Sequence, residues 1–284
     1  MADVIKAFVL GHPITHSRSP LIHNYWLNQH GLSGSYEAID IAPGTLAGFL
    51  TSVRSGEFAG GNITVPLKEE AFAAVDCLTE TAKAIGAVNT VFMLDGALWG
   101  DNTDAYGFSA NLADITGQWK QSQNAVVIGA GGAARAIVKS LIDAGFAEIK
   151  ILNRTLSRAD ELAHAFVANV IAQPLADFTN AIHNADLIVN TSSIGMAGKD
   201  DAGDMIRFDF TTAKTSALVT DIVYVPLETR FLKSARSAGL KTLDGLGMLL
   251  HQAVPGFERW FGVRPQVDAE LRALIEADLF KAKP

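Results

Sequence analysis

The sequence predicts an α/β protein built from two domains, and three observations support this prediction. Short β-rich runs alternate with longer helical patterns along most of the 284 residues, as is typical of parallel strands joined by crossover helices. A glycine-rich turn follows the apolar run at residues 124–128 and precedes a helical pattern. A hairpin signal at Asp95-Gly96 interrupts the alternation, which places a domain change around residue 105.

The first part of the chain contains three strand-like runs, each followed by a helical pattern. The runs are Ala7–Gly11, Ser35–Ile41 and Gly61–Val65. Helices are expected from about Pro20 to His30 and after Pro43. Pro66 is expected to open the third helix, because its fixed φ suits a first helical turn. Residues 89–104 differ, since two strand-like runs flank the favoured two-residue hairpin turn Asp95-Gly96.

A second series of apolar runs with following helical patterns begins at Asn124. It comprises residues 124–128, 185–192 and 217–224. The tail at residues 266–283 has the pattern of an amphipathic helix. That pattern does not show which domain the tail joins.

Composition and charge exclude several classes of protein. A net charge of −7 argues against a general nucleic-acid binder, and a hydrophobic content of 49% allows a sizeable core. Cys77 is the only cysteine, so an internal disulfide is impossible and a reducing compartment is expected. The N-terminus lacks a signal peptide's apolar core, and no apolar run reaches membrane-spanning length. We therefore expect a cytoplasmic protein that binds neither nucleic acid nor membrane.

Residues 129–134 (GAGGAA) have the G-x-G-x-x-G/A form of a dinucleotide-binding loop. Gly129 would make the tight turn, Gly131 would let backbone N–H groups approach a pyrophosphate, and Ala134 would pack closely on the strand. The N-terminus of the following helix would face the phosphates. A structural β–α turn also favours glycine. Because the flanking strand, helix and next strand are all present, the context favours dinucleotide binding and a Rossmann-type doubly wound sheet.

The end of the next strand selects between NAD and NADP. About 20 residues past the loop, an NAD site usually presents Asp or Glu to the ribose 2′-hydroxyl. This chain presents Asn153, Arg154 and Thr155 there, with Arg158 one turn later. The two guanidinium groups could bind a 2′-phosphate, which favours NADP. In the alternative, Thr155 caps a helix and the arginines are solvated.

Lys68 occupies an unusual position, because the first turn of a helix disfavours a cation. A lysine placed there and shielded from water could exchange a proton near neutral pH. Otherwise it is a surface lysine balanced by Glu69 and Glu70. Asp104 favours the first interpretation, since a carboxylate beside the ammonium could hold its charge and orientation. Asp104 is otherwise a helix N-cap, and Asn89 supplies an amide at the start of the hairpin.

Ser17 and Ser19 flank Arg18 just before Pro20. If this stretch is extended, both hydroxyl groups face one way and could hold a small carboxylate at a helix start. Ser19 also suits an N-cap, which is the role we expect first. The histidines near this segment lack a metal-ligand spacing and Cys77 is isolated, so no metal site is expected.

The combination of motifs along the chain resembles the shikimate dehydrogenase family from about residue 8 to residue 255. The motifs are, in order, GHPITHSRSPLIHN, GGNITVPLK, GAVNT, GDNTD, GAGGAARA, NRT, NTSSIGM, DIVY and DGLGMLLHQA. The combination is far more specific than any one motif. Ile222 stands where the family frequently has methionine, and the NTSSIGM segment varies around Ser192 and Ser193.

The resemblance implies a role for each matching residue. Lys68 and Asp104 would form the catalytic pair. The residues that would bind substrate are Ser17, Ser19, Thr64, Asn89, Tyr224 and Gln252. The residues that would bind the cofactor are Gly129, Ala130, Gly131, Gly132, Ala133, Asn153, Arg154, Thr155, Arg158, Ile222 and Gly245.

The resemblance also implies an architecture and a reaction. Residues 1–104 and 252–284 would form an α/β substrate domain and residues 105–251 the NADP domain, with the active site in the cleft. The reaction would be reversible reduction of 3-dehydroshikimate to shikimate with NADPH, a step towards chorismate and aromatic amino acids. Ser19 and the NRT motif point to shikimate and NADP. The alternatives are a quinate/shikimate dehydrogenase of broader range and a catalytically silent NADP-binding regulator. The chain would act as a monomer or homodimer.

Overall fold

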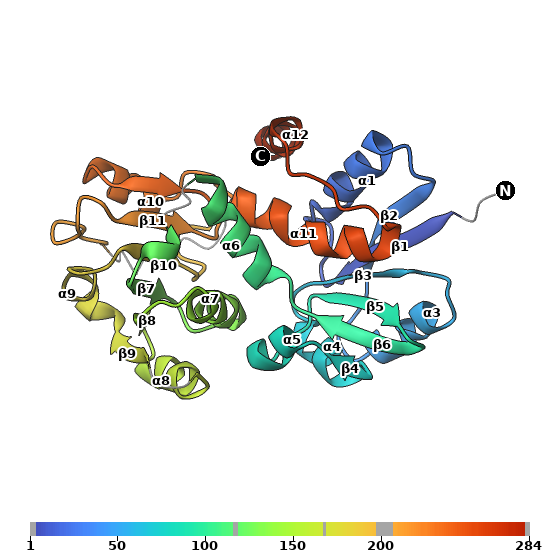
Figure 1. The fold of residues 1–284 in the computed structure, drawn as a ribbon, viewed down its shortest axis with the longest axis horizontal. Helices are drawn as coiled ribbons and strands as arrows, with labels where there is room; N and C mark the ends of the chain where they lie inside the picture. Colours follow the sequence, from blue (N-terminus) through green and yellow to red (C-terminus); the bar gives the residue numbers. More distant parts are fainter. Residues whose placement is uncertain (1–3, 116–118, 167–168, 197–206, 282–284) are drawn as a thin grey trace. The chain divides into compact units, whose positions relative to one another are not determined.

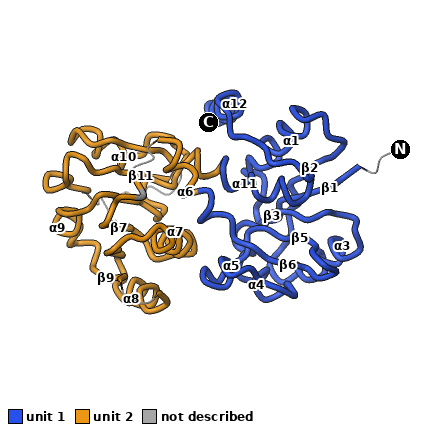
Figure 2. The backbone as a smooth tube through the Cα atoms, viewed as in Figure 1, with its two compact units in different colours: residues 1–107, 250–284 blue, residues 108–249 orange. Residues whose placement is uncertain are grey.

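The computed structural model describes residues 4–115, 119–166, 169–196 and 207–281. The chain divides into two compact units (Figures 1 and 2). Unit 1 consists of residues 1–107 and 250–284, and unit 2 of residues 108–249. Each unit is built around its own β-sheet.

The sheet of unit 1 is mixed. Its strand order is β2-β1-β3-β5-β6-β4. β1 pairs in parallel with β2 and β3, whereas β5 and β6 form the predicted antiparallel hairpin. Asp95 and Gly96 in its turn both have positive φ, as a tight two-residue turn requires. The strands are β1 (Ile5–Gly11), β2 (Gly34–Asp40), β3 (Gly60–Ile63), β4 (Cys77–Leu78), β5 (Thr90–Leu94) and β6 (Ala97–Asp101).

Strands β1 and β2 contribute to two buried clusters in unit 1. Phe8 and Leu10 of β1 pack with Leu46 in one of them. On α1, His23 stacks on Tyr36 of β2 in an aromatic cluster that also includes Phe257. The helices of unit 1 are α1 (Ser19–Gln29), α2 (Leu46–Phe49), α3 (Thr51–Arg54), α4 (Lys68–Ala74), α5 (Glu80–Ile85) and α12 (Ala269–Lys281).

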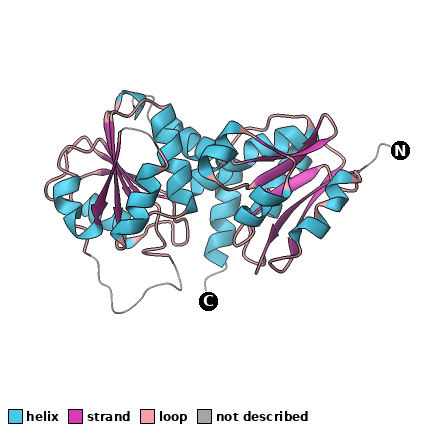
Figure 3. Ribbon diagram, turned by 90° about the horizontal axis from the view of Figure 1, so that it is seen from below, coloured by secondary structure: helices cyan, strands magenta, loops and turns pink. Residues whose placement is uncertain are grey.

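Unit 2 is a parallel sheet with helices on both faces (Figure 3). The strand order β12-β11-β10-β7-β8-β9 reverses direction at the neighbours β7 and β10. This is the doubly wound arrangement expected from the sequence, and ligands bind such sheets at the carboxyl ends of the strands near the reversal. The strands are β7 (Asn124–Ile128), β8 (Glu148–Asn153), β9 (Val170–Pro174), β10 (Leu187–Asn190), β11 (Leu218–Asp221) and β12 (Lys241–Leu243).

Two buried clusters cover the faces of this sheet. One joins Val127 to Ile137 of α7 and Leu162 of α8, and the other joins Val126 to Phe231 of α10. Because side chains alternate along a strand, these neighbouring valines face opposite sides. The helices of unit 2 are η1 (Trp119–Gln121), α7 (Gly132–Asp143), α8 (Leu156–His164), η2 (Leu175–Asp177), α9 (Phe178–Ala181) and α10 (Arg230–Ser237).

The chain passes between the units inside helices. α6 (Asp104–Ile115) contains the first boundary, and α11 (Leu246–Phe261) contains the second. The tail forms α12 in unit 1, where Asp278 pairs with Arg18 before α1. This placement answers the question that the tail's own pattern left open. Leu274 and Phe280 of α12 are exposed, so the expected separation of apolar and polar faces is incomplete.

Candidate active site

Lys68 is the first residue of α4, and its ammonium forms an ion pair with Asp104. The Lys68 Nζ–Asp104 Oδ2 distance is 2.7 Å, and the two side chains are 28% and 16% exposed. The helix starts two residues after Pro66, which lies in the preceding turn. Glu70 does not balance Lys68, because its carboxylate accepts hydrogen bonds from the N–H groups of Gly44 and Leu46. Lys68 is therefore a partly shielded cation with a specific carboxylate partner.

Asp104 is held on both of its oxygens. Its Oδ1 accepts a hydrogen bond from Asn89 Nδ2 at 2.8 Å, while Oδ2 accepts from Lys68. Asp104 begins α6, where the helix dipole favours a negative charge. Its own N–H donates to Asn102 Oδ1 at 3.1 Å. The carboxylate is thus fixed in orientation beside an ammonium that is still open to solvent.

Asn89 is itself fixed by a buried polar network. Its Oδ1 accepts from Thr103 N at 2.9 Å and from Thr90 Oγ1 at 2.9 Å. Asn62 Nδ2 donates to the Asn89 carbonyl and to Thr90 Oγ1, both at 3.1 Å. Tyr36 closes the network by donating to Asn62 Oδ1 at 2.6 Å. The sequence analysis did not predict these partners of Asn89. Asn62, a polar residue within a strand-like run, was the signal that could have indicated a buried polar network.

Ser17 and Ser19 lie at the start of α1, but not as the sequence predicted. Arg18 occupies the N-cap position with αR dihedrals, so the segment is not extended there. Ser19 is the first helical residue rather than the N-cap, and its N–H donates to Ser17 Oγ at 3.3 Å. The expected N-cap role of Ser19 is therefore wrong. The local reason is that Arg18 O accepts the first helical hydrogen bond, from Ile22 N.

Two further residues expected to bind substrate also belong to unit 1. Thr64 lies in the loop between β3 and α4 and is half-buried. A Cβ atom on Gly11 would lie 2.7 Å from the methyl group of Thr64, so glycine at position 11 leaves room for the Thr64 side chain. Gln252 lies in α11 and is half-buried. Tyr224 belongs to unit 2 and follows β11.

The glycine loop in unit 2 joins β7 to α7 at the reversal of the sheet. Gly129 has φ of 106°, and a side chain there would lie 2.7 Å from Thr191 Oγ1. Gly131 is the N-cap of α7, and a side chain on it or on Gly132 would meet nothing within 4 Å. Ala134 is fully buried in the core. The start of α7 therefore has no side-chain cap and leaves room beside both glycines, which fits the binding of a pyrophosphate.

The NRT segment lies at the carboxyl end of the neighbouring strand β8. Asn153 ends the strand, and its Nδ2 donates to the Thr155 carbonyl at 2.8 Å. Thr155 holds the N-cap position of α8, but its side chain makes no cap hydrogen bond. Arg154 and Arg158 are both exposed. Two other predicted cofactor residues, Ala130 and Ala133, flank the Gly131-Gly132 pair that follows β7.

Ile222 and Gly245 are in direct contact on the other half of the sheet. A side chain on Gly245 would lie 2.3 Å from the Ile222 carbonyl oxygen, so only glycine fits. The buried Asp221, which precedes Ile222, accepts hydrogen bonds from Asn190 Nδ2, Val223 N and Thr229 Oγ1. Burial raises the pKa of Asp221 to about 6, against the opposing effect of these donors.

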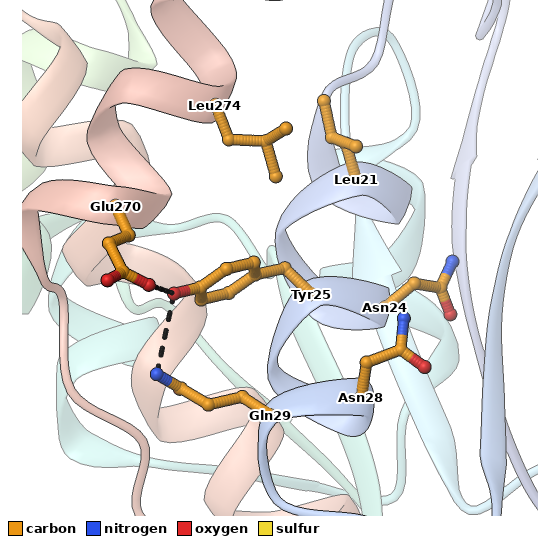
Figure 4. A pocket seen from close by; sticks show the side chains of 7 residues that line it. All are labelled: Leu21, Asn24, Tyr25, Asn28, Gln29, Glu270 and Leu274. Atoms are coloured by element: carbon orange, nitrogen blue, oxygen red, sulfur yellow. Dashed lines mark hydrogen bonds between the residues drawn. The ribbon is translucent and has the colours of Figure 1, made fainter.

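A cavity of about 480 Å³ lies between α1 and α12 in unit 1 (Figure 4). Leu21 and Leu274 line it, together with amide side chains and Glu270. Tyr25 extends across it and hydrogen-bonds Glu270 and Gln29. None of the predicted site residues lines this cavity. It is therefore separate from the Lys68–Asp104 pair.

Neither a metal site nor a membrane-spanning helix is found among the described residues. Within residues 4–115, 119–166, 169–196 and 207–281, no group of three or more His, Cys, Asp or Glu side chains is arranged to hold a metal ion. Among the helices in this part of the chain, none is both long and apolar enough to cross a bilayer.

Three family models match the chain in succession. The shikimate dehydrogenase substrate binding domain matches residues 9–91, and the shikimate/quinate 5-dehydrogenase model matches residues 111–223. The shikimate 5′-dehydrogenase C-terminal domain matches residues 245–275. The chain belongs to the shikimate dehydrogenase family. The resemblance found in the motifs is thereby confirmed.

Relatives within the shikimate dehydrogenase family extend over nearly the whole chain. Shikimate dehydrogenase (NADP(+)) of Brucella abortus is 54% identical over 99% of this chain and 97% of its own length. The crystal structure of shikimate 5-dehydrogenase from Thermus thermophilus with NADP(H) and shikimate has a TM-score of 0.83 and 39% identity, covering 96% of this chain and 100% of that one. Quinate dehydrogenase from Corynebacterium glutamicum with NAD has a TM-score of 0.85 and 30% identity, covering 97% and 99%.

Proposed function

We propose that this protein catalyses the reversible, NADP-dependent reduction of 3-dehydroshikimate to shikimate. The observation that carries the proposal is the Lys68–Asp104 ion pair at 2.7 Å, with Asn89 on the second carboxylate oxygen. Membership of the shikimate dehydrogenase family and the names of the NADP-dependent relatives support it. The alternative of a catalytically silent regulator gives no reason for a lysine and an aspartate in this arrangement.

Lys68 handles the proton that accompanies hydride transfer. In the direction of reduction its ammonium donates a proton to the ketone oxygen as that carbon becomes a secondary alcohol. In oxidation the neutral amine takes the hydroxyl proton back. The bound nicotinamide cofactor supplies or accepts the hydride. Asp104 stabilises the ammonium and orients it, because its carboxylate lies 2.7 Å away and is fixed by Asn89.

The substrate is held by the six residues that the family resemblance assigns to it. Ser17 and Ser19, at the start of α1, bind the substrate carboxylate, since hydroxyl groups and a helix start both favour an anion. Thr64 and Asn89 contact the ring hydroxyl groups. Tyr224 and Gln252 complete the set, as the family resemblance implies. The serine at position 19 favours shikimate over quinate.

The cofactor is held by unit 2. The N–H groups at Gly131 and Gly132 bind the pyrophosphate at the start of α7. Arg154 and Arg158 bind the 2′-phosphate, and the N-R-T segment offers no carboxylate that would repel it. Ile222 and Gly245 contact the other mononucleotide, which a doubly wound sheet places beyond the reversal point.

Two expectations about the cellular form remain predictions. The single cysteine favours a reducing compartment such as the cytoplasm. The protein is expected to act as a monomer or homodimer on a small-molecule substrate.

The experiment that tests the proposal is a comparison of NADP⁺ reduction with shikimate and with quinate, followed at 340 nm (the reduced-nicotinamide band), with NAD⁺ in parallel. The purified protein is expected to prefer shikimate and NADP⁺. Lys68→Met is expected to lower kcat by roughly 10²–10⁴ with a modest change in KM, as for lost general acid–base catalysis.

Lys83→Met is the matched control. Lys83 pairs with Glu80 on an exposed face of α5, so it tests the loss of a surface ion pair alone. The control is expected to keep the wild-type kcat. A wild-type protein without turnover on either acid refutes the proposed function, and a Lys68→Met variant with wild-type kcat removes Lys68 from the mechanism.

A further inference from the structure

Asp221 is a fully buried carboxylate that closes a loop at the carboxyl end of β11. Its Oδ1 accepts from Val223 N at 3.0 Å, and its Oδ2 accepts from Thr229 Oγ1 at 2.7 Å. Val223 and Thr229 stand near the two ends of the segment that joins β11 to α10. A single side chain therefore fixes both ends of the segment that contains Ile222 and Tyr224.

The same carboxylate is tied to the neighbouring strand. Asn190, the last residue of β10, donates from Nδ2 to Asp221 Oδ1 at 3.0 Å. Asn190 Oδ1 in turn accepts from the N–H and the hydroxyl of Ser192. Thr191, between them, donates to the Ile128 carbonyl at 2.7 Å, next to the glycine loop. These hydrogen bonds connect the carboxyl ends of β7, β10 and β11.

Ionisation of Asp221 in this buried position lowers the stability of the fold. All three groups that donate to Asp221 are neutral, and burial is the dominant effect on its pKa. A folded-state pKa raised to about 6 means that ionisation of Asp221 costs stability as the pH rises from 3.8 through 6. Asp221 also lies at the carboxyl end of a strand, on the edge of the sheet where doubly wound sheets bind ligands.

The chemistry of the contacts explains why an acid is used. Three donors converge on the side chain, and a carboxylate is an acceptor on both oxygens. An asparagine of the same shape would present an N–H₂ group to at least one of these donors. Gly245 adds a packing constraint, because its Cα lies against the Ile222 and Asp221 carbonyl groups.

We propose that Asp221 is a positioning residue that shapes the β11–α10 segment for the nicotinamide half of the cofactor. This inference rests on the proposed function, since it takes Ile222 and Gly245 as cofactor contacts. Arg154 lies beyond β8, on the opposite side of the reversal point. The adenosine 2′-phosphate half of the ligand therefore does not depend on Asp221.

The test uses two ligands that separate these halves. Dissociation constants for NADP⁺ and for adenosine 2′,5′-bisphosphate, which lacks the nicotinamide, are measured by calorimetry on the full chain. Asp221→Asn is expected to raise the Kd for NADP⁺ about tenfold and to leave the Kd for the bisphosphate within about twofold. Equal weakening of both ligands overturns the proposal, because a general loss of structure would have that effect. Unchanged binding of both ligands overturns it as well.

Substitutions of Thr229 provide a second test of the role of Asp221 if the Asp221→Asn variant does not fold. Thr229→Val removes the donor to Asp221 together with the N-cap acceptor of Leu232 N, and it is expected to weaken NADP⁺ binding selectively. Thr229→Ser keeps the hydroxyl group, and therefore both hydrogen bonds, and is expected to retain wild-type binding. If Thr229→Val binds NADP⁺ as tightly as the wild type, or weakens NADP⁺ and the bisphosphate equally, the proposal is refuted. Ser140→Ala, which deletes a partly buried 2.6 Å hydrogen bond with Ser109 away from the segment, is the control and should change neither Kd.

Wild-type activity separates this inference from the proposed function. A wild-type protein that binds NADP⁺ but does not oxidise shikimate refutes the function. The ratio of the two dissociation constants in the variants still decides the role of Asp221.

Discussion

Asn89, which precedes β5, donates a hydrogen bond at 2.8 Å to Asp104, which follows β6. The two residues are 15 positions apart, and the hairpin returns the chain so that they meet. This contact sets the orientation of the carboxylate that holds Lys68. It is therefore the part of the site that mutagenesis can disturb without touching the lysine.

Asn89→Ala should lower turnover while leaving Lys68 in place. The change removes the donor to Asp104 Oδ1 and the acceptor of Thr103 N. We expect kcat with shikimate to fall by about 10–100-fold, because the carboxylate loses its fixed orientation. Steady-state kinetics measure the effect, and Asn28→Ala on α1 is the control. An unchanged kcat contradicts a role for Asn89 in orienting Asp104.

Substitutions at two glycines should separate stability from cofactor binding. In Gly131→Ala the new methyl group lies in open space and the φ of −97° suits alanine, so the melting temperature should stay close to wild type. The Kd for NADP⁺ should rise, because the methyl group occupies space that the cofactor would use. Gly129→Ala requires a φ of 106° and a contact 2.7 Å from Thr191, so it should lower both stability and affinity. Thermal unfolding and calorimetry check the pair. Equal effects of the two changes on stability would contradict the geometry of the loop.

Arg154→Ala should change the preference between the two cofactors. Loss of one guanidinium should lower kcat/KM for NADP⁺ about tenfold and leave that for NAD⁺ nearly constant, since only NADP⁺ carries the 2′-phosphate. Arg236→Ala on α10, which breaks an exposed ion pair with Glu228, is the control. A constant ratio of the two kcat/KM values would remove Arg154 from the 2′-phosphate site.

His23 should make the protein sensitive to acid. Burial lowers the pKa of His23 to about 3 from 6.5, so its neutral form stabilises the fold above pH 6.5 and this stability is lost as the pH falls towards 3. Between pH 7 and pH 5 the wild-type free energy of unfolding should therefore drop by about 2 kcal/mol more than that of His23→Leu. Urea unfolding at the two pH values measures the difference. His183→Leu, an exposed site, should behave as wild type.

The sequence was sufficient to predict the parts of the fold that depend on local patterns. Alternating runs predicted strands β1, β2, β3, β7, β8, β10 and β11 and helices α1, α4, α7 and α10, and Asp95-Gly96 predicted the hairpin, because turn chemistry and periodicity act over a few residues. The strands β4, β9 and β12 were not predicted. The doubly wound sheet followed from the same patterns. The domain boundaries expected near residues 104 and 251 compare with divisions after Gly107 and Leu249 in the structure.

Other features depend on contacts between distant segments, which local patterns do not contain. Arg18 takes the N-cap position of α1 while its guanidinium pairs with Asp278, 260 residues later (278 minus 18). The Tyr36–Asn62 hydrogen bond joins two strands through polar groups in otherwise apolar runs. The motifs and the resemblance paired Lys68 with Asp104, but only the structure shows that Asn89 contacts the other oxygen of the same carboxylate.

Unit 1 is made from two separate stretches of chain, and Phe257 and Trp260 from the second stretch pack on His23 from the first. Unit 2 is one continuous stretch. During translation, residues 108–249 leave the ribosome as a complete unit while the N-terminal stretch still lacks these aromatic partners. Nascent chains should therefore become protease-resistant in unit 2 first, and the half that carries Lys68 should mature only near the end of synthesis.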